Sequence, residues 1–244
     1  MARRLFFVPA VNRDVAELHG DLAQHLTRVL RVEQGQIFEI SDNEHLYLAE
    51  VEVARKSVVV FRVKQRLEPR PEPFPVTLYA SLFKFDHFEW MIEKATELGV
   101  GVIQPIVSER SEHGLEKAAP KRAERWRRIL MEASQQCRRV RMPEFRALLD
   151  WETAIQGSDG LKVWLDERPG GRPLLEVMET EKPSAVTLLL GPEGGWADRE
   201  AEKIADCGWI PTSLGSLVLR AETAALAALT LVQASGSAAR GSRS

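Results

Sequence analysis

Residues 188–200 read LLLGPEGGWADRE, and this stretch indicates how the second half of the chain folds. Three successive leucines are typical of a buried strand, and ADRE is typical of a helix start. Between them stand Gly191, Gly194 and Gly195, although a connection from strand to helix needs only about two to six residues. This conformational freedom predicts a backbone that bends sharply and closely approaches something else.

Strands and helices alternate on both sides of this stretch. Expected strands cover residues 76–81, 100–108, 161–167, 185–191 and 210–215, and expected helices cover residues 86–99, 119–139, 198–208 and 220–235. In the first helix the apolar residues fall on one face, and Gly99 suits the position just after its end. The alternation predicts an α/β domain with a parallel sheet covered on both faces.

The N-terminal part has the pattern of a small β-barrel. Residues 35–41, 46–53 and 57–66 are short and rich in β-branched and aromatic residues, which is typical of strands. Helical spacing within residues 14–35, carried by Leu22, Leu26, Val29 and Leu30, predicts one or two short helices.

Residues 67–75, LEPRPEPFP, contain four prolines and predict a domain boundary. We expect a first domain over residues 1–68, a linker over 69–75 and a second domain over 76–235. The small polar residues 236–244 predict a disordered tail.

The composition favours a cytoplasmic protein that binds no metal. The longest apolar run, AALAALTLV, is too short to cross a bilayer, and the N-terminus lacks the apolar core of a signal peptide. Cys137 and Cys207 are isolated, and no spacing of His, Cys and Asp indicates zinc. All five histidines lie in the first half of the chain, away from the glycine loop, and we expect surface or capping residues rather than ligands. They are His19, His25, His45, His87 and His113.

Charge is unevenly distributed along the chain. The net charge is −2 and the pI about 6.3, which argues weakly against a nucleic-acid partner. Residues 121–141, however, hold eight Lys or Arg and two Glu. This segment is either a solvated helix face or a phosphate-binding surface.

Three expected strands end in unusual residues, and ligands of α/β sheets bind beyond such ends. One ends in Asp166 and Glu167, one in the glycine loop, and one in Leu214 and Gly215. The last leads to Arg220, Ala221, Glu222 and Thr223 at a helix start, which is either a functional site or an ordinary helix cap. The glycine loop lacks both the P-loop and the dinucleotide pattern, so it either wraps a nucleoside or is a tight turn without a ligand. Trp196, directly after the glycines, is the tryptophan placed to contact a ligand.

Taken together, these motifs resemble the RsmE-type 16S rRNA (uracil-N3) methyltransferases of the SPOUT superfamily. The similar stretches are RRLFFVP, HLTRVLRVEQGQIFEISD, IEKATELGVGVIQPIVSERS, RWRRILMEASQQCRRVRMPE, LLLGPEGGW and LGSLVLRAETAAL, and they span nearly the whole chain. One departure is FKFDHFE, where Phe85 stands in place of a glycine between Lys84 and Asp86.

The resemblance implies a SPOUT-type parallel sheet with a C-terminal trefoil knot, an N-terminal PUA-like β-barrel, and a homodimer. It implies methylation of N3 of a uridine, uridine 1498 in that family, with S-adenosylmethionine as methyl donor and 16S rRNA or the small ribosomal subunit as partner. The implied cofactor-binding residues are Leu165, Asp166, Glu167, Leu190, Gly191, Pro192, Glu193, Gly194, Gly195, Leu214, Gly215, Leu219, Arg220, Ala221 and Thr223. A bulky side chain at Gly194 is expected to block cofactor binding.

The reaction needs removal of the N3 proton and stabilisation of the charge left on the base. Arg220 is expected to stabilise that charge, and Glu222 and Glu193 are candidates for accepting the proton. Candidate RNA contacts are Arg3, Arg4, Arg28, Arg31, Lys84, Arg138, Arg139 and Arg141. The alternatives are a SPOUT methyltransferase with another rRNA or tRNA target and a non-catalytic RNA-binding assembly protein. No dinucleotide fingerprint follows an early strand, which excludes a nucleotide-binding oxidoreductase.

Overall fold

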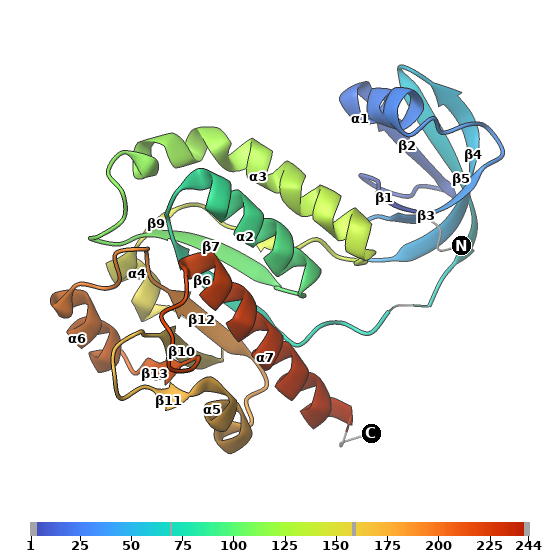
Figure 1. Cartoon of the computed structure of the whole chain (residues 1–244). Coiled ribbons are helices and arrows are strands. Elements are labelled where there is room, and N and C mark those ends of the chain that lie inside the picture. Colours follow the sequence, from blue (N-terminus) through green and yellow to red (C-terminus); the bar gives the residue numbers. More distant parts are fainter. Residues whose placement is uncertain (1–3, 69, 158–159, 242–244) are drawn as a thin grey trace. The chain divides into compact units, whose positions relative to one another are not determined.

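The computed structural model describes residues 4–68, 70–157 and 160–241 (Figure 1). The chain divides into two compact units, Met1–Pro71 with Met131–Met142, and Glu72–Leu130 with Pro143–Ser244. The division after Pro71 falls within the proline-rich segment. The return of residues 131–142 to the N-terminal unit is not visible in the sequence, because it depends on contacts between distant parts of the chain.

The N-terminal unit is built on a five-stranded mixed sheet that curls into a half-barrel. Its strands are β1 (Leu5–Phe7), β2 (Val15–His19), β3 (Ile37–Ser41), β4 (Leu46–Arg55) and β5 (Val58–Arg66), in the order β1-β3-β4-β5-β2. The β1–β3 pair is parallel and the other pairs are antiparallel. Alternate residues such as Ala49, Val51, Val59 and Phe61 point into the core, as the period of a strand requires.

The prediction of one or two short helices within residues 14–35 is confirmed, and they take up only part of this stretch. Residues 15–19 form β2, and the helical part is limited to α1 (Gly20–Gln24) and a π-helical segment (His25–Val29). Leu26 is buried, but Val29 is 64% exposed. A π-helical turn holds more residues than an α-helical turn, so it rotates Val29 away from the face on which α-helical spacing places it.

The C-terminal unit contains the predicted parallel sheet. Its strands are β6 (Val76–Ser81), β7 (Val102–Val107), β8 (Glu144–Phe145), β9 (Leu149–Asp150), β10 (Leu161–Leu165), β11 (Arg172–Pro173), β12 (Val186–Leu190) and β13 (Ile210–Ser213). The order is β11-β13-β10-β12-β6-β7-β8, β9 also pairs with β7, and every pair is parallel. The strand of the opening leucines, β12, is therefore central. The trefoil knot stays a prediction of the resemblance.

Helices cover both faces of this sheet, as the alternation predicts. They are α2 (Phe85–Glu97), α3 (Leu115–Cys137), α4 (Trp151–Gln156), α5 (Leu174–Glu181), α6 (Asp198–Asp206) and α7 (Ala221–Gly241). Leu188 and Leu190 of β12 pack in one cluster with residues of α2, α3, α5 and α7, whereas Leu189 packs in the other with residues of α4 and α6. Figure 1 shows α2 and α7 side by side. No helix among the described residues is long and apolar enough to span a membrane.

The last helix is longer than the sequence predicts. Disorder is expected from residue 236, but α7 continues to Gly241, and residues 242–244 lie outside the described part. Gly236 is buried against Phe74, whose ring would lie 2.1 Å from a Cβ atom at that position. The side chain of Gln233 also donates to Phe74 O and accepts from Phe74 N, both at 2.8 Å. These contacts to the proline-rich segment stabilise the C-terminal part of α7, where the composition predicts no helix.

Candidate functional site

The three strand ends singled out in the sequence meet at one edge of the C-terminal sheet. Leu165 of β10 is in register with Leu190 of β12, and also with Thr212 of β13. Parallel strands present their carboxyl ends at the same edge, so the loops that follow them converge. They enclose a cavity of about 730 Å³, a size typical of small-molecule sites.

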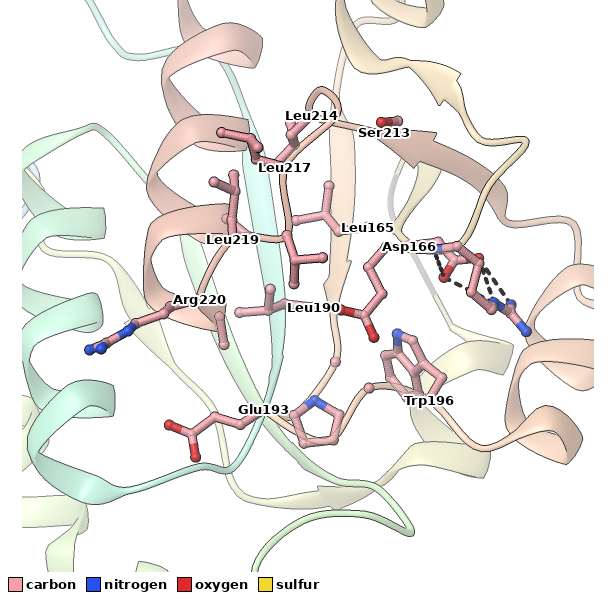
Figure 2. Close-up of a pocket in the computed structure, with 18 of the residues that line it drawn as sticks. Leu165, Asp166, Leu190, Glu193, Trp196, Ser213, Leu214, Leu217, Leu219 and Arg220 are labelled. Carbon is pink, nitrogen blue, oxygen red and sulfur yellow. Dashed lines mark hydrogen bonds and ion pairs between the residues drawn. The ribbon is translucent and has the colours of Figure 1, made fainter.

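The wall of the cavity is apolar in the middle and charged at its ends. Figure 2 shows Leu165, Leu190 and Leu219 between Asp166 on one side and Glu193 and Arg220 on the other. The full lining is Lys84, His87, Arg110, Leu165, Asp166, Glu167, Arg168, Leu190, Gly191, Pro192, Glu193, Gly195, Trp196, Asp198, Thr212, Ser213, Leu214, Gly215, Ser216, Leu217, Val218, Leu219, Arg220, Ala221 and Ala224. The predicted residues Gly194, Glu222 and Thr223 are not on this wall.

Two glycines of the loop permit close packing behind the cavity. A Cβ atom at Gly191 would lie 2.7 Å from Nε1 of Trp196, whose side chain is almost fully buried. Gly195 has φ +67° and closes a turn through its N–H to Pro192 O at 2.9 Å, and a Cβ atom there would lie 2.9 Å from Glu167 Oε1. These close approaches explain why the turn needs residues without side chains.

Gly194 has a different environment from the one predicted. A Cβ atom there would meet Arg110 Cβ at 3.4 Å, which is ordinary contact, and its φ is not positive. Its carbonyl accepts a hydrogen bond from Arg110 Nη1 at 3.1 Å. Gly194 is not among the lining residues, although Arg110 is, and the expectation that a bulky side chain at Gly194 blocks cofactor binding stays a prediction.

A buried carboxylate holds the glycine loop against the loop that follows β7. Glu200, fully buried in the first turn of α6, accepts from Ala197 N and from Glu109 N, both at 2.8 Å. Arg110, from the same β7 loop, bonds the carbonyl of Gly194. The role of Glu200 is not visible in the sequence, where it has the pattern of an ordinary charged residue in the first turn of a helix.

Asp166 is held by a salt bridge at one end of the cavity. Arg168 Nη2 lies 2.9 Å from Asp166 Oδ2, and the guanidinium also stacks over Trp164, 5.1 Å from the ring centroid. The hydrogen bond to Asp166 raises the pKa of Arg168 above its ordinary value. The Asp166 carboxylate is thus fixed in place beside the cavity.

The candidates for catalysis gather at the other end. Arg220 is exposed, and Figure 2 shows its side chain turned away from the leucines. Among the described residues, its guanidinium has no hydrogen bond or ion pair. Glu193 is half-exposed, and Glu222, only 8% exposed, lies behind the wall in the first turn of α7.

His87 was wrongly grouped with the histidines remote from the site. Its Nδ1 lies 3.3 Å from Glu222 Oε1 and 3.8 Å from Glu193 Oε1. The signal that was missed is its place in the first turn of α2, directly after β6, because β6 pairs with β12 and therefore ends at the same edge. No group of three or more residues within the described part is arranged to hold a metal ion.

The predicted RNA contacts have mixed environments. Arg4, Arg28 and Arg31 are exposed in the N-terminal unit, Lys84 lines the cavity, and Arg3 lies outside the described residues. Arg139 donates from Nε to Arg141 O at 3.1 Å.

Arg138, one of the predicted RNA contacts, takes part in an ion pair within the N-terminal unit. It pairs with Glu39 Oε1 at 2.6 Å, and Arg70 pairs with Glu39 Oε2 at 2.5 Å. Burial alone would raise the pKa of Glu39, but the hydrogen bonds from Arg138 and Arg70 outweigh it and lower that pKa.

The basic helix is also partly neutralised within the C-terminal unit. Arg122 and Arg125 pair with the buried Glu89 of α2 at 3.0 and 2.8 Å. Phe85, which replaces the glycine of the resembling family, stacks edge-on against Trp126 and lies 5.0 Å from the Arg122 guanidinium. Part of the basic segment therefore has a structural role within the C-terminal unit.

Known families and structures are similar to nearly the whole chain. The RNA methyltransferase domain family matches residues 70–233, and the RNA methyltransferase PUA domain family matches residues 18–63. The chain is 33% identical to the ribosomal RNA small subunit methyltransferase E of Synechocystis, over 96% of this chain and 78% of that protein.

Solved structures share the complete fold. A ribosomal RNA small subunit methyltransferase E from Neisseria gonorrhoeae, bound to S-adenosylmethionine, is 27% identical with a TM-score of 0.86, over 95% of this chain and 97% of that chain. A methyltransferase from Legionella pneumophila in complex with the same cofactor is 31% identical with a TM-score of 0.84, over 96% and 98% of the two chains.

Proposed function

This chain belongs to the ribosomal RNA small subunit methyltransferase E family, and from that premise we propose that it transfers a methyl group from S-adenosylmethionine to N3 of a uridine in 16S rRNA. The observation that carries the proposal is the cavity at the edge of the sheet. The ends of β10, β12 and β13 converge there. Thirteen of its lining residues are those that the family resemblance implies for cofactor binding: Leu165, Asp166, Glu167, Leu190, Gly191, Pro192, Glu193, Gly195, Leu214, Gly215, Leu219, Arg220 and Ala221.

The residues present fit S-adenosylmethionine. Leu165, Leu190 and Leu219 offer apolar surface for the faces of an adenine, and the backbone of the glycine loop offers hydrogen bonds for its edge. Nε1 of Trp196 is buried on this wall and, among the described residues, has no hydrogen-bond partner. A buried donor without a partner costs free energy, which a ligand acceptor would recover.

Glu193 and Glu167 add negative charge to the wall, which favours a cationic ligand. Bound there, S-adenosylmethionine would supply a methyl group made electrophilic by its sulfonium.

Arg220 is proposed to stabilise the negative charge that develops on the uracil. A guanidinium is always protonated and presents a planar fork of donors, which suits the carbonyl oxygens beside N3. Its side chain has no partner among the described residues, so the charge is available for a substrate. The remaining contribution of the site is to hold the base in line with the methyl group.

The RNA is proposed to be held by exposed arginines of the N-terminal unit, Arg4, Arg28 and Arg31, and by Lys84 at the cavity. Such contacts bind phosphates and carry little sequence information, so the target base must be unstacked and read at its edge. The net charge of −2 predicts weak binding to free RNA and a preference for the assembled subunit. We propose a homodimer that works in the cytoplasm, where small ribosomal subunits are found.

The first test is methyl transfer to small ribosomal subunits from a strain that lacks 3-methyluridine in 16S rRNA. The protein is incubated with labelled S-adenosylmethionine, and the nucleosides are identified by mass spectrometry. We expect 3-methyluridine at one position of 16S rRNA. Label at another atom or in tRNA would overturn the proposed target, and absence of both label and cofactor binding would favour the non-catalytic alternative.

A further inference from the structure

The first turns of α2 and α7 bring together a histidine and a buried carboxylate. His87 Nδ1 lies 3.3 Å from Glu222 Oε1. Glu222 is 8% exposed, and its Oε2 atom has no hydrogen-bond partner among the described residues. A buried carboxylate is stable only when it is paired, and the His87 ring lies within ion-pair distance of Glu222.

We propose that His87 is the residue that accepts the N3 proton of the uracil and that Glu222 positions it. This inference rests on the proposed methylation of N3. In it, Nδ1–H of His87 donates to Glu222, which leaves the lone pair of Nε2 for the substrate. The arrangement is that of a buried carboxylate that selects the tautomer of a catalytic histidine and stabilises the imidazolium that forms. In the structure the two atoms are 3.3 Å apart but not aligned as a hydrogen bond, and His87 Nδ1 has no hydrogen-bond partner among the described residues. Catalytic contacts are often poorly aligned before substrate binds.

His87 is better placed for this role than either glutamate of the site. It lines the cavity, whereas Glu222 is 8% exposed and is not among the lining residues. Glu193 is 44% exposed, so water competes with a substrate for its carboxylate. An imidazole is the side chain best matched to proton exchange near neutral pH.

The charges around His87 suit a group that becomes cationic when it accepts a proton. Lys84 stands just before the first turn of α2, in which His87 lies. Three carboxylates face the ring: Asp86 on α2 at 3.8 Å from Nε2, Glu193 on the glycine loop at 3.8 Å from Nδ1, and Glu222 on α7. They stabilise the imidazolium once the proton has been transferred.

The proton transfer completes a balanced reaction. The N3–H bond breaks as its proton passes to Nε2 of His87. The electron pair left on N3 forms the new bond to the methyl carbon, and the bond from that carbon to sulfur breaks with its pair on the sulfur. His87 then releases the proton to solvent.

The test compares His87→Asn with the control His113→Asn, a substitution at an exposed histidine of the same unit. Asparagine retains a donor toward Glu222 but cannot accept a proton near neutral pH. We expect kcat to fall about 100-fold or more in His87→Asn, with affinity for S-adenosylmethionine within about threefold of the wild type. Glu222→Gln should lower kcat less, because it removes the positioning charge and leaves the base.

Two further measurements separate proton transfer from a structural role. The wild-type kcat/KM should rise with pH as the base loses its proton, and this limb should be absent in His87→Asn. Subunits that carry 5-fluorouridine, whose N3 proton is more acidic, should restore much of the rate of His87→Asn.

Equal rates in His87→Asn and the wild type, or a wild-type profile that is flat below neutral pH, would overturn the role of His87. Failure of the wild type to form 3-methyluridine would instead overturn the proposed function.

Discussion

At the scale of single residues, Gly191 and Gly194 stand in the same loop but meet different surroundings. A methyl group at Gly191 would lie 2.7 Å from the buried indole of Trp196, whereas one at Gly194 would lie 3.4 Å from Arg110. We expect Gly191→Ala to displace the Trp196 ring from the cavity wall and to weaken binding of S-adenosylmethionine by about tenfold or more, or about 1.4 kcal/mol. Gly194→Ala is the matched control and should bind within about threefold of the wild type. Calorimetric titration measures both, and equal losses would contradict this assignment.

Arg220 is the residue on which charge stabilisation is proposed to depend. Its guanidinium has no partner among the described residues, so Arg220→Ala should leave the fold intact. We expect methyl transfer to be abolished and affinity for S-adenosylmethionine to stay within about tenfold, a change of at most about 1.4 kcal/mol. Single-turnover transfer and titration of the cofactor separate the two effects. A variant with normal transfer would remove Arg220 from the mechanism.

At the scale of elements, α6 supports the glycine loop through Glu200. Its two carboxylate oxygens accept from Ala197 N and Glu109 N, and no exposed surface remains on the residue. In Glu200→Gln one backbone N–H would face an NH2 group, so a buried donor loses its acceptor. We expect a loss of about 1–3 kcal/mol in the free energy of unfolding, together with weaker cofactor binding.

The control for this prediction is Glu202→Gln, which changes an exposed carboxylate on the same helix. It should alter the free energy of unfolding by less than about 0.5 kcal/mol. Urea unfolding and cofactor titration of both variants provide the comparison. If the two variants were equally stable, Glu200 would not be a support of the loop.

At the scale of the whole molecule, Glu39, Arg70 and Arg138 join three distant parts of the chain within the N-terminal unit. Glu39 has a lowered pKa, so its ionised form stabilises the fold above its ordinary value of 4.5, and this stability is lost as the pH falls through the lowered value. We expect Glu39→Gln to cost about 2–3 kcal/mol at pH 7, less than a fully buried pair because both arginines are about one-third exposed.

The same substitution should flatten the acid dependence of stability. Wild-type protein should lose stability steeply below about pH 4.5, and Glu39→Gln should lose less over the same window. Glu33→Gln, at an exposed carboxylate of the same unit, should retain the wild-type dependence. Urea titrations at several pH values measure this. Parallel curves for the wild type and Glu39→Gln would show that the charge cluster does not stabilise the unit.

Local pattern was sufficient to predict much of this protein. The parallel sheet, its main helices, Gly99 after α2 and the edge at which the site forms all follow from periodicity and turn residues, because burial along a strand or a helix repeats at a fixed interval. The motifs around residues 191–195 and 220–223 were sufficient to indicate the family. The glycines within residues 191–195 indicate a loop that bends sharply and approaches another group closely.

Only the tertiary structure revealed which groups meet across long distances in sequence. His87 and Glu222 are separated by more than half of the chain, and they lie together because β6 and β12 are neighbours and α2 packs beside α7. The ion pair of Glu39 with Arg138 likewise joins residues that are distant in sequence. Phe74 packs against Gly236, and α7 continues past residue 236, where the composition predicts disorder. The spacing of apolar residues along the chain predicts which face of each helix or strand is buried. Which charged residues pair depends on which elements become neighbours, and the packing of the whole unit decides that.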